Sequence, residues 1–431
     1  MSCSTDVIII GAGCSGLSAA RELSRLGLTY NLIEGSHRIG GRAYSEEIVA
    51  GVWFDLGCSY LHQGETNPFV AIAEELGVII GKDKGDIFED HRRSLYQNGE
   101  PLDADQHAAY FNYVAECNAA IQTAADQGED VAISDLVDLD NEYALSYMHA
   151  MAELNAVDID QTSCMDFAAF DDGSDIPVLN GYGNLVATWG ADIAVSLNTR
   201  VERIDWSGKG VCVETSRGTV QARTVLSTVS TGILASGDIE FAPALPDWKM
   251  EAILGLPTGT ENKVCIHFDR DVFGPDGRGF HSTWNDNGQA CGFEASVMGQ
   301  NTAIVFTGGR HAVWLEKQGR QAGHDYAVDR IAEAFGNDIR KHVTRSIVTA
   351  WTTDPWTRGS YSCALPGQAH QRNELARPLD ERVFFAGEAA TVGDHACCHG
   401  ALGSGLRAAQ KIADTLDPEL KHKQVFLSEG C

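Results

Sequence analysis

The 431-residue sequence predicts an α/β protein of the two-domain α+β kind: a discontinuous Rossmann-like nucleotide-binding domain and an inserted domain of mixed sheet and helices. Three observations lead to this prediction. A strand, a glycine-rich turn and a helix begin the chain, a second strand–turn–helix pattern occupies residues 383–409, and the composition changes several times between them. The chain is long enough to bury two hydrophobic cores.

The N-terminal pattern reads as a βαβ unit. The apolar run at residues 7–10 is typical of a strand that is buried on both faces of a parallel sheet. Leu17, Ala20 and Leu23 then recur at helical spacing, and residues 29–34, TYNLIE, form the second strand.

The middle of the chain changes character twice. Residues 71–175 show helical periodicity and many alanines and acids, whereas residues 199–229 contain short β-type segments that we assign, with the C-terminal pattern, to the first domain. The predicted nucleotide-binding domain therefore comprises residues 1–70, 176–245 and 378–417, the substrate-binding domain comprises 71–175 and 246–377, and a polar tail follows at 418–431.

The formal net charge is −28 and is unevenly distributed. Between Val70 and Asp175 we count 24 Asp and Glu against four Lys and Arg, so this stretch carries −20 of that charge. A nucleic-acid partner would require the opposite sign and is not expected. Two interpretations stay open: an acidic field that concentrates a cationic substrate, or an acid-rich solvated surface.

The sequence contains no apolar run of membrane-spanning length and no signal-peptide pattern, so we expect a cytoplasmic protein without membrane contact. Its 12 cysteines are never spaced as Cys-x-x-Cys, and we interpret them mostly as reduced core residues. The oligomeric state, monomer or homodimer, is left open.

Gly11, Gly13 and Gly16 form a GxGxxG motif between the first strand and its helix, and Glu34 ends the next strand. Glycines there permit a tight turn and close approach of the backbone to a pyrophosphate, while the acid can bind ribose hydroxyls. The motif alone does not distinguish NAD from FAD.

A second glycine turn follows at Gly40, Gly41 and Arg42, and its arginine suits a pyrophosphate clamp. At this point the chain resembles the flavin-containing amine oxidase family, whose N-terminal signature is GxGxxG, then Glu, then GGR. The segments FDLGCSYLHQGETNPF (54–69) and WTTDPWTRGSYSCALPG (351–367) are similar to the polyamine oxidase and lysine-specific demethylase branch, which is related to monoamine oxidase.

The resemblance implies that both ends of the chain bind one FAD. The C-terminal VFFAGEAA…HGALGSGLRAA matches the family's second FAD loop, with a helix expected to begin near Gly400. The family's cysteine for covalent flavin attachment is replaced by Ser360, so we expect non-covalent FAD. The expected cofactor-binding residues are Gly11, Gly13, Gly16, Glu34, Gly40, Gly41, Arg42, Val201, Gly387, Glu388, Gly400 and Ala401.

The resemblance also assigns the reacting site. Lys263 would hold a water near flavin N5, Tyr361 would be one of two facing aromatic rings, and His62 would line the substrate entrance. The position of the second ring is Cys397, which cannot act as an aromatic wall and opens that side of the site.

The cluster His395-Ala-Cys-Cys-His399 has residue types that ligate zinc or iron. Because the His399-Gly-Ala step is the family's ordinary helix start, no metal site is expected.

The leading hypothesis is oxidation of a polyamine-like or other extended amine by hydride transfer to FAD, followed by imine hydrolysis and reoxidation by O2 to give H2O2. An L-amino acid oxidase is the first alternative and would need a pocket arginine such as Arg310 or Arg358 to pair with the substrate carboxylate. A non-catalytic flavoprotein is the second, although it would have no need of Lys263.

Overall fold

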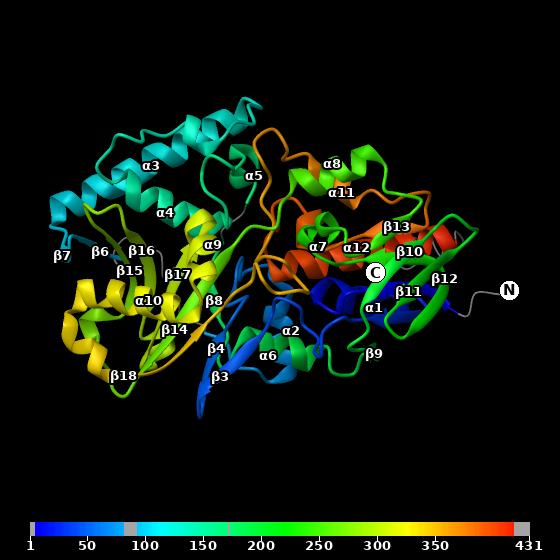
Figure 1. The fold of residues 1–431 in the computed structure, drawn as a ribbon, viewed down its shortest axis with the longest axis horizontal. Helices are drawn as coiled ribbons and strands as arrows, with labels where there is room; N and C mark the ends of the chain where they lie inside the picture. The colour runs from blue at the N-terminus through cyan, green and yellow to red at the C-terminus, as the bar shows by residue number, and fades with distance from the viewer. Residues whose placement is uncertain (1–4, 82–92, 171–172, 418–431) are drawn as a thin grey trace, which may run out of the picture. The chain divides into compact units, whose positions relative to one another are not determined.

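The computed structural model describes residues 5–81, 93–170 and 173–417, which form two compact units (Figure 1). The predicted polar tail lies outside the described residues. Unit 1 comprises Met1–Ala43, Val186–Pro257 and His370–Cys431, and unit 2 comprises Tyr44–Leu185 and Thr258–Ala369. These units begin and end at other residues than the predicted domains, whose cofactor and substrate roles stay a prediction.

Unit 1 is built around β1 (Thr5–Ile10), whose residues Val7 to Ile9 are fully buried. β1 pairs in parallel with β2 (Tyr30–Ile33) on one edge and with β12 (Gly218–Ser227) on the other. β12 pairs in turn with β19 (Val383–Phe385), also in parallel. The predicted βαβ start and the assignment of the C-terminal strand to the same sheet are therefore confirmed.

The first and last helices of unit 1 pack against each other: α1 (Cys14–Arg25) and α12 (Cys398–Leu416) lie side by side in Figure 1 as blue and red ribbons. A Cβ on Gly405 of α12 would lie 2.1 Å from the carbonyl oxygen of Ser15 in α1, so glycine is required for this close approach. The Ser18 hydroxyl of α1 donates to the Leu402 carbonyl of α12 at 2.8 Å.

The predicted short β segments of residues 199–229 form an antiparallel ribbon on this sheet. β11 (Val211–Thr215) pairs with β10 (Val201–Asp205) and with the first half of β12. The sheet order is β13-β10-β11-β12-β1-β2-β9 with β19 beside β12. The remaining elements are β9 (Val195–Ser196), α7 (Thr231–Ser236), β13 (Glu240–Ala242), α8 (Asp247–Gly255), α11 (Gln371–Ala376) and η6 (Glu388–Ala390), and α6 (Tyr182–Trp189) spans the boundary of the units.

Unit 2 contains a seven-stranded sheet in the order β18-β14-β17-β16-β15-β6-β7. Its pairs are antiparallel except β15 with β6. The strands are β6 (Arg93–Gln97), β7 (Glu100–Pro101), β14 (Glu261–Phe268), β15 (Gly279–Trp284), β16 (Ala290–Ala295), β17 (Thr302–Gly308) and β18 (Val343–Val348). Val264, Ile266 and Phe268 of β14 share a core with Ala327 and Ile331 of α10 (Arg320–Phe335).

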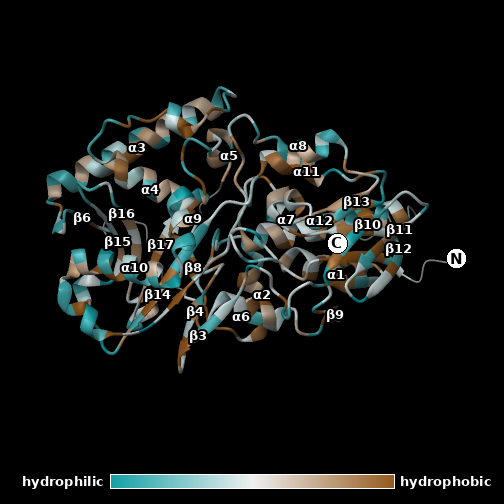
Figure 2. Ribbon diagram, viewed as in Figure 1, coloured by the Kyte–Doolittle hydropathy of each residue, from teal (hydrophilic) through white to brown (hydrophobic). Residues whose placement is uncertain are grey.

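The described part of the acidic stretch 71–175 contains the predicted helices, and it also contributes β6 and β7 to the sheet. Its helices are α3 (Ala104–Asp126), α4 (Ala144–Asn155) and α5 (Cys164–Ala168), preceded by α2 (Pro68–Leu76). In α3 the buried residues recur at spacings of three and four and include Tyr110, Cys117 and Ile121. Figure 2 shows α3 with alternating hydrophilic and hydrophobic colours, as expected of a helix with one buried face.

Two short ladders and the remaining turns complete unit 2. The ladders pair β3 (Ser45–Val49) with β4 (Val52–Asp55) and β5 (Tyr60–Leu61) with β8 (Ile176–Pro177). The other elements are α9 (Gly309–Gln318), η2 (Ile133–Asp135), η3 (Pro275–Gly277), η4 (Val297–Gly299) and η5 (Asn337–His342).

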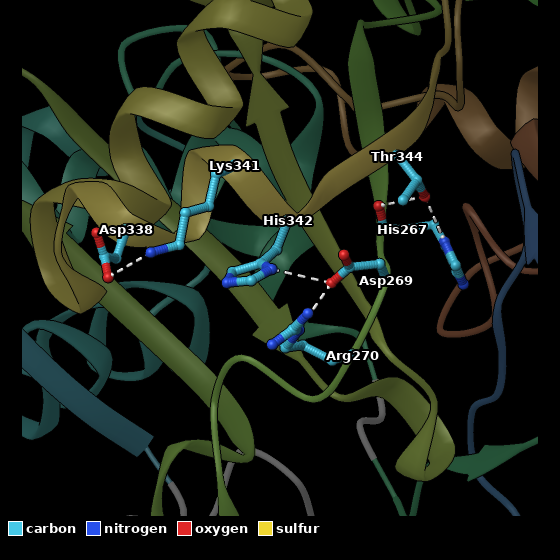
Figure 3. A network of polar contacts seen from close by, with 7 residues as sticks. All are labelled: His267, Asp269, Arg270, Asp338, Lys341, His342 and Thr344. Atoms are coloured by element: carbon cyan, nitrogen blue, oxygen red, sulfur yellow. Dashed lines mark hydrogen bonds and ion pairs between the residues drawn. The ribbon is translucent and has the colours of Figure 1, made fainter.

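Polar contacts lie at the β18 edge of the seven-stranded sheet, where β18 follows η5 (Figure 3). His342 Nδ1 lies 2.9 Å from Asp269 Oδ1, and Arg270 donates to the same oxygen at 3.0 Å. His267 Nδ1 lies 2.6 Å from the Thr344 hydroxyl. The Arg270 hydrogen bond holds the pKa of Asp269 below its usual value, so this carboxylate stays charged at the edge.

No helix within the described residues is both long and apolar enough to cross a membrane.

Lys249 stabilises unit 1 through buried hydrogen bonds to backbone carbonyls. This residue of α8 is fully buried, and its ammonium donates at 2.7–2.8 Å to the carbonyls of Glu374, Leu375 and Arg377 at the end of α11. Lys249→Met leaves these carbonyls without the donor, so we expect the free energy of unfolding to fall by about 2–4 kcal/mol, measured by urea denaturation. Lys209→Met, at an exposed position of the same unit, should leave it unchanged. Equal stabilities of the two variants would contradict this role.

Candidate active site

The glycines of the first loop are required by its geometry. Gly11 has φ +99°, and a Cβ there would lie 2.7 Å from the Thr228 hydroxyl. A Cβ on Gly16 would lie 1.9 Å from the Gly11 carbonyl oxygen. Any side chain at these two positions would therefore open the turn between β1 and α1.

The second glycine turn lies directly against the first. Gly13 and Gly40 form an isolated parallel bridge, and the Gly40 amide donates to the Ala12 carbonyl at 2.8 Å. A Cβ on Gly41 would lie 3.3 Å from the Gly13 Cα. Helix α1 begins after Gly13 with no capping side chain and no acid in its first turn, so its backbone amides are available to an anion.

Glu34 lies at the same loop and is buried. Its carboxylate accepts hydrogen bonds from the Ala12 amide at 2.7 Å and the Ser36 amide at 2.8 Å. Its carbonyl accepts from the Thr199 amide, two residues before the buried Val201 that begins β10. The structure thus brings Val201, Glu34 and the glycine loop into one region of unit 1.

Arg42 forms an ion pair with Glu388, with Nη1 and Oε1 2.9 Å apart. The other carboxylate oxygen of Glu388 accepts from the Ala396 amide at 3.0 Å. Arg42 and Glu388 line a cavity, as does Gly387, whose amide donates to the Ser404 hydroxyl. The two glycine-rich ends of the sequence therefore meet at this charged pair.

The last helix begins near Gly400, as predicted. α12 begins at Cys398, two residues before Gly400, so Gly400 and Ala401 lie within its first turn. Cys397 is the buried N-cap residue, and its carbonyl accepts from the Ala401 amide at 3.1 Å. A Cβ on Gly400 would lie 1.8 Å from the Asp394 carbonyl oxygen, which explains why glycine is needed there.

These observations fit a bound dinucleotide. An uncapped helix start, two glycine turns without room for side chains, a buried acid and an arginine all belong to unit 1. Each of the twelve expected cofactor-binding residues lies in this unit. The fold and this arrangement define a dinucleotide-binding protein of the Rossmann-like class.

Lys263, in unit 2, is buried on β14 with 5% of its surface exposed, which excludes a snorkelling surface lysine. Its ammonium donates to the Gly57 carbonyl at 2.5 Å and to the Ser59 hydroxyl at 2.6 Å. The loop 57–59 that accepts these hydrogen bonds leads directly to Tyr60 and His62. Lys263 therefore contacts the same chain segment that carries the expected entrance histidine.

Two acids lie close enough to Lys263 to interact with its charge. Desolvation raises the pKa of Asp55 to about 6, against the lowering effects of hydrogen bonds from Ser45 and the Tyr182 amide and of the Lys263 charge. Burial raises the pKa of Glu261 to about 7, and the Lys263 charge again opposes the rise. Near neutral pH both acids therefore titrate beside the lysine.

His62 and Tyr60 each contact an acid. His62 Nδ1 lies 2.6 Å from Asp175 Oδ1, and the histidine side chain is 37% exposed, so it is not a packed core residue. The Tyr60 hydroxyl donates to the buried Glu294 carboxylate. Burial, followed by the Glu294 charge, raises the pKa of Tyr60 well above its usual value.

The Tyr361 hydroxyl donates to the Glu153 carbonyl at 2.6 Å, near the end of α4. The Glu153 carboxylate in turn accepts from the Gly292 amide at 3.0 Å and lies 2.9 Å from His149 Nδ1. These contacts fix the hydroxyl end of the ring to a buried part of unit 2.

Sequence reasoning missed Asp175, Glu294 and Glu153 as individual residues. Most described acids of the stretch 70–175 are exposed, and those that are buried are Glu153, Asp166 and Asp175. The surface acids thus account for most of the charge, while a small buried subset lies near His62 and Tyr361. Burial of an acid cannot be read from a sequence in which acids are this frequent.

The histidines of the HACCH segment are buried, and His399 Nε2 lies 3.9 Å from Asp394 Oδ1. Among the residues that the structure describes, no group of three or more His, Cys, Asp or Glu is arranged to hold a metal ion.

Comparison with known proteins identifies the family. A model described as "Flavin containing amine oxidoreductase" matches residues 82–413, and one described as "NAD(P)-binding Rossmann-like domain" matches residues 9–76. The chain belongs to the flavin-containing amine oxidoreductase family. It is an FAD-dependent amine oxidase, as the sequence predicted.

Similar proteins include "Probable polyamine oxidase 4" of Arabidopsis thaliana, 31% identical with 94% of this chain and 86% of that protein covered. "Lysine-specific histone demethylase 1 homolog 1" of Oryza sativa subsp. japonica is also 31% identical, with 94% of this chain but 52% of that protein covered. Cyclohexylamine oxidase from Brevibacterium oxydans IH-35A has the same fold, with a TM-score of 0.81 at 22% identity over 96% of this chain and 99% of that one.

The raised pKa of Glu261 predicts a pH-dependent stability. The folded state binds the proton more tightly than the unfolded chain, so the free energy of unfolding falls as pH rises from about 4.5 to 7. Glu261→Gln removes this titration, and we expect its stability relative to wild type to rise by about 1–3 kcal/mol between pH 4.5 and 8, measured by urea denaturation. The exposed Glu100→Gln serves as control. Parallel pH profiles for wild type and Glu261→Gln would contradict the prediction.

Proposed function

We propose that this protein oxidises a polyamine-like or other extended amine and releases hydrogen peroxide. Bound FAD would accept a hydride from the amine carbon, and after hydrolysis of the imine by water its electrons would pass to O2. The observation that carries the proposal is Lys263, a buried cation held at two fixed oxygens of the loop that leads to Tyr60 and His62.

The role proposed for Lys263 is to hold and orient a water at its ammonium. Gly57 and Ser59 accept two of its three protons and fix the direction of the third. Burying a lysine this deeply costs free energy unless its charge is compensated, and Asp55 and Glu261 supply that compensation. A passive flavin-binding protein would gain nothing from this arrangement.

His62 is proposed to exchange a proton with the substrate amine. An amine must be neutral to lose hydride, so the site needs a base near its entrance. Asp175 holds Nδ1, which orients the ring and leaves Nε2 as the nitrogen that can exchange a proton with the substrate. Partial exposure of the side chain allows the proton to reach water.

The extended-amine class is supported by Asp175 and Glu294. Both acids are buried, and they contact His62 and Tyr60 respectively. A second ammonium group of an extended substrate would find hydrogen-bonding carboxylates there, whereas a simple monoamine would not use them. Relatives named polyamine oxidases agree with this choice.

Cys397 in unit 1 and Ser360 in unit 2 support two further parts of the proposal. A cysteine at position 397 leaves the second ring of the family's cage missing, which suits a long substrate better than a small aromatic amine. Ser360 carries no sulfur for a covalent flavin bond: its hydroxyl donates to the Gly259 carbonyl and accepts from the Glu261 amide. We therefore propose non-covalent FAD.

The L-amino acid oxidase alternative is less well supported. Arg310 is 61% exposed and pairs with Asp158 and Asp160, and Arg358 is exposed. Their exposure disfavours either guanidinium as the partner of a substrate carboxylate in a buried site.

The direct test is peroxide release by the purified FAD-bound protein with polyamines, monoamines and amino acids. We expect release with spermidine-like cations and a loss of about 100-fold in Lys263→Met, because the water loses its donor. The matched control is Lys317→Met, an exposed lysine of unit 2. Unchanged turnover in Lys263→Met would remove the lysine's role, and peroxide from no amine, together with a flavin that amines do not bleach anaerobically, would overturn the proposed function.

Asp175→Asn tests the substrate class. We expect KM for a diamine or polyamine to rise about 10-fold or more, because a charge-assisted hydrogen bond is lost, while KM for a monoamine of similar length changes little. The exposed Asp160→Asn should affect neither substrate. If both KM values rise equally, Asp175 acts through His62 alone and the extended-amine assignment fails.

A further inference from the structure

Two cysteines from opposite ends of the sequence lie in direct contact inside unit 1. Cys14 Sγ and Cys398 Sγ are 2.8 Å apart, although the residues are separated by 384 positions. Both thiols are buried, with 5% and 7% exposure. We propose that they form a redox-active pair, which a hydroperoxide converts to a disulfide that ties α1 to α12.

The geometry favours this reaction. A disulfide bond is about 2.05 Å long, so closing it moves the two sulfurs together by less than about 1 Å. Cys14 is the first residue of α1 and Cys398 is the first residue of α12, and the glycine contacts of Gly405 hold these helices together. The two thiols are thus carried by helices that already pack against each other.

The chemistry balances with one hydroperoxide. One thiol transfers its sulfur lone pair to a peroxide oxygen, giving a sulfenic acid and water. The other thiol then attacks that sulfur, loses its proton and expels a second water. Two thiols lose two electrons and two protons in total, and one hydrogen peroxide is reduced to two waters. Peroxide can be added from outside, so the inference does not rest on the proposed amine oxidation.

A Cys14–Cys398 disulfide would link two distant segments of unit 1. Unit 1 is assembled from three separate chain segments, and Cys14 and Cys398 belong to the first and the third. A disulfide there closes the chain around the whole inserted unit and restricts the unfolded state strongly. It also joins α1, which follows the N-terminal glycine loop, to α12, which follows the C-terminal segment of Gly387 and Glu388, so the oxidised protein should retain its dinucleotide more firmly.

The experiment uses the FAD-bound full chain, reduced with a dithiol, desalted and then treated with hydrogen peroxide. Remaining thiols are blocked before digestion, and fragment mass spectra locate any cross-link. We expect a Cys14–Cys398 linked peptide that is two hydrogen atoms lighter than its parts, and two fewer titratable thiols than the 12 of the reduced chain. We also expect Tm to rise by about 5 °C and FAD release, followed by flavin fluorescence, to need more urea.

Cys14→Ala and Cys398→Ala should each abolish the cross-link and both shifts, whereas Cys212→Ala, in β11 of the same unit, should retain them. A cross-link through Cys397, separate sulfinic acids at both positions, or two unmodified thiols would overturn the proposal. If one alanine variant does not fold, the wild-type mass spectra and the other variant decide the question.

Discussion

The parallel pairing of β1 with both β2 and β12, together with the packing of α12 on α1, is the constraint on which unit 1 depends. Unit 1 is made of three segments that are far apart in the sequence, and these contacts bring them together. The close approach depends on glycine, because a Cβ at Gly16 or Gly405 would overlap backbone oxygen atoms. Once the helices are in place, Arg42 from one end of the chain reaches Glu388 from the other.

Each of the two units compensates its buried charge with polar contacts. In unit 1 the Arg42–Glu388 pair neutralises itself, and the second Glu388 oxygen is bound by a backbone amide. In unit 2 Lys263 is hydrogen-bonded to neutral oxygens, and the nearby acids Asp55 and Glu261 have raised pKa values because desolvation exceeds the help that the lysine gives them. Asp55 and Glu261 therefore titrate close to neutral pH, whereas an isolated carboxylate would not.

The sequence was informative wherever the signal is local. Glycine turns, the apolar run of β1 and the helical spacing of α1 depend on neighbouring residues, and the structure has them where they were predicted. Strand β6 was missed inside the acidic stretch because its partner β15 lies far along the chain, and β7 joins the sheet by pairing with β6. The contacts of His62 with Asp175 and of Tyr60 with Glu294 span 113 and 234 positions and leave no pattern in the sequence.

Glu153 shows how such a distant contact positions Tyr361, a predicted site residue. Its carbonyl lies in the last turn of α4, where helix carbonyls have no intrahelical donor, and the Tyr361 hydroxyl supplies one. Its carboxylate is bound to the Gly292 amide of β16, so helix, strand and ring are joined through a single residue. Because α4 also packs on β17 so closely that Gly308 has no room for a side chain, the carbonyl cannot shift independently of the sheet. The position of the Tyr361 hydroxyl is therefore set by the core of unit 2.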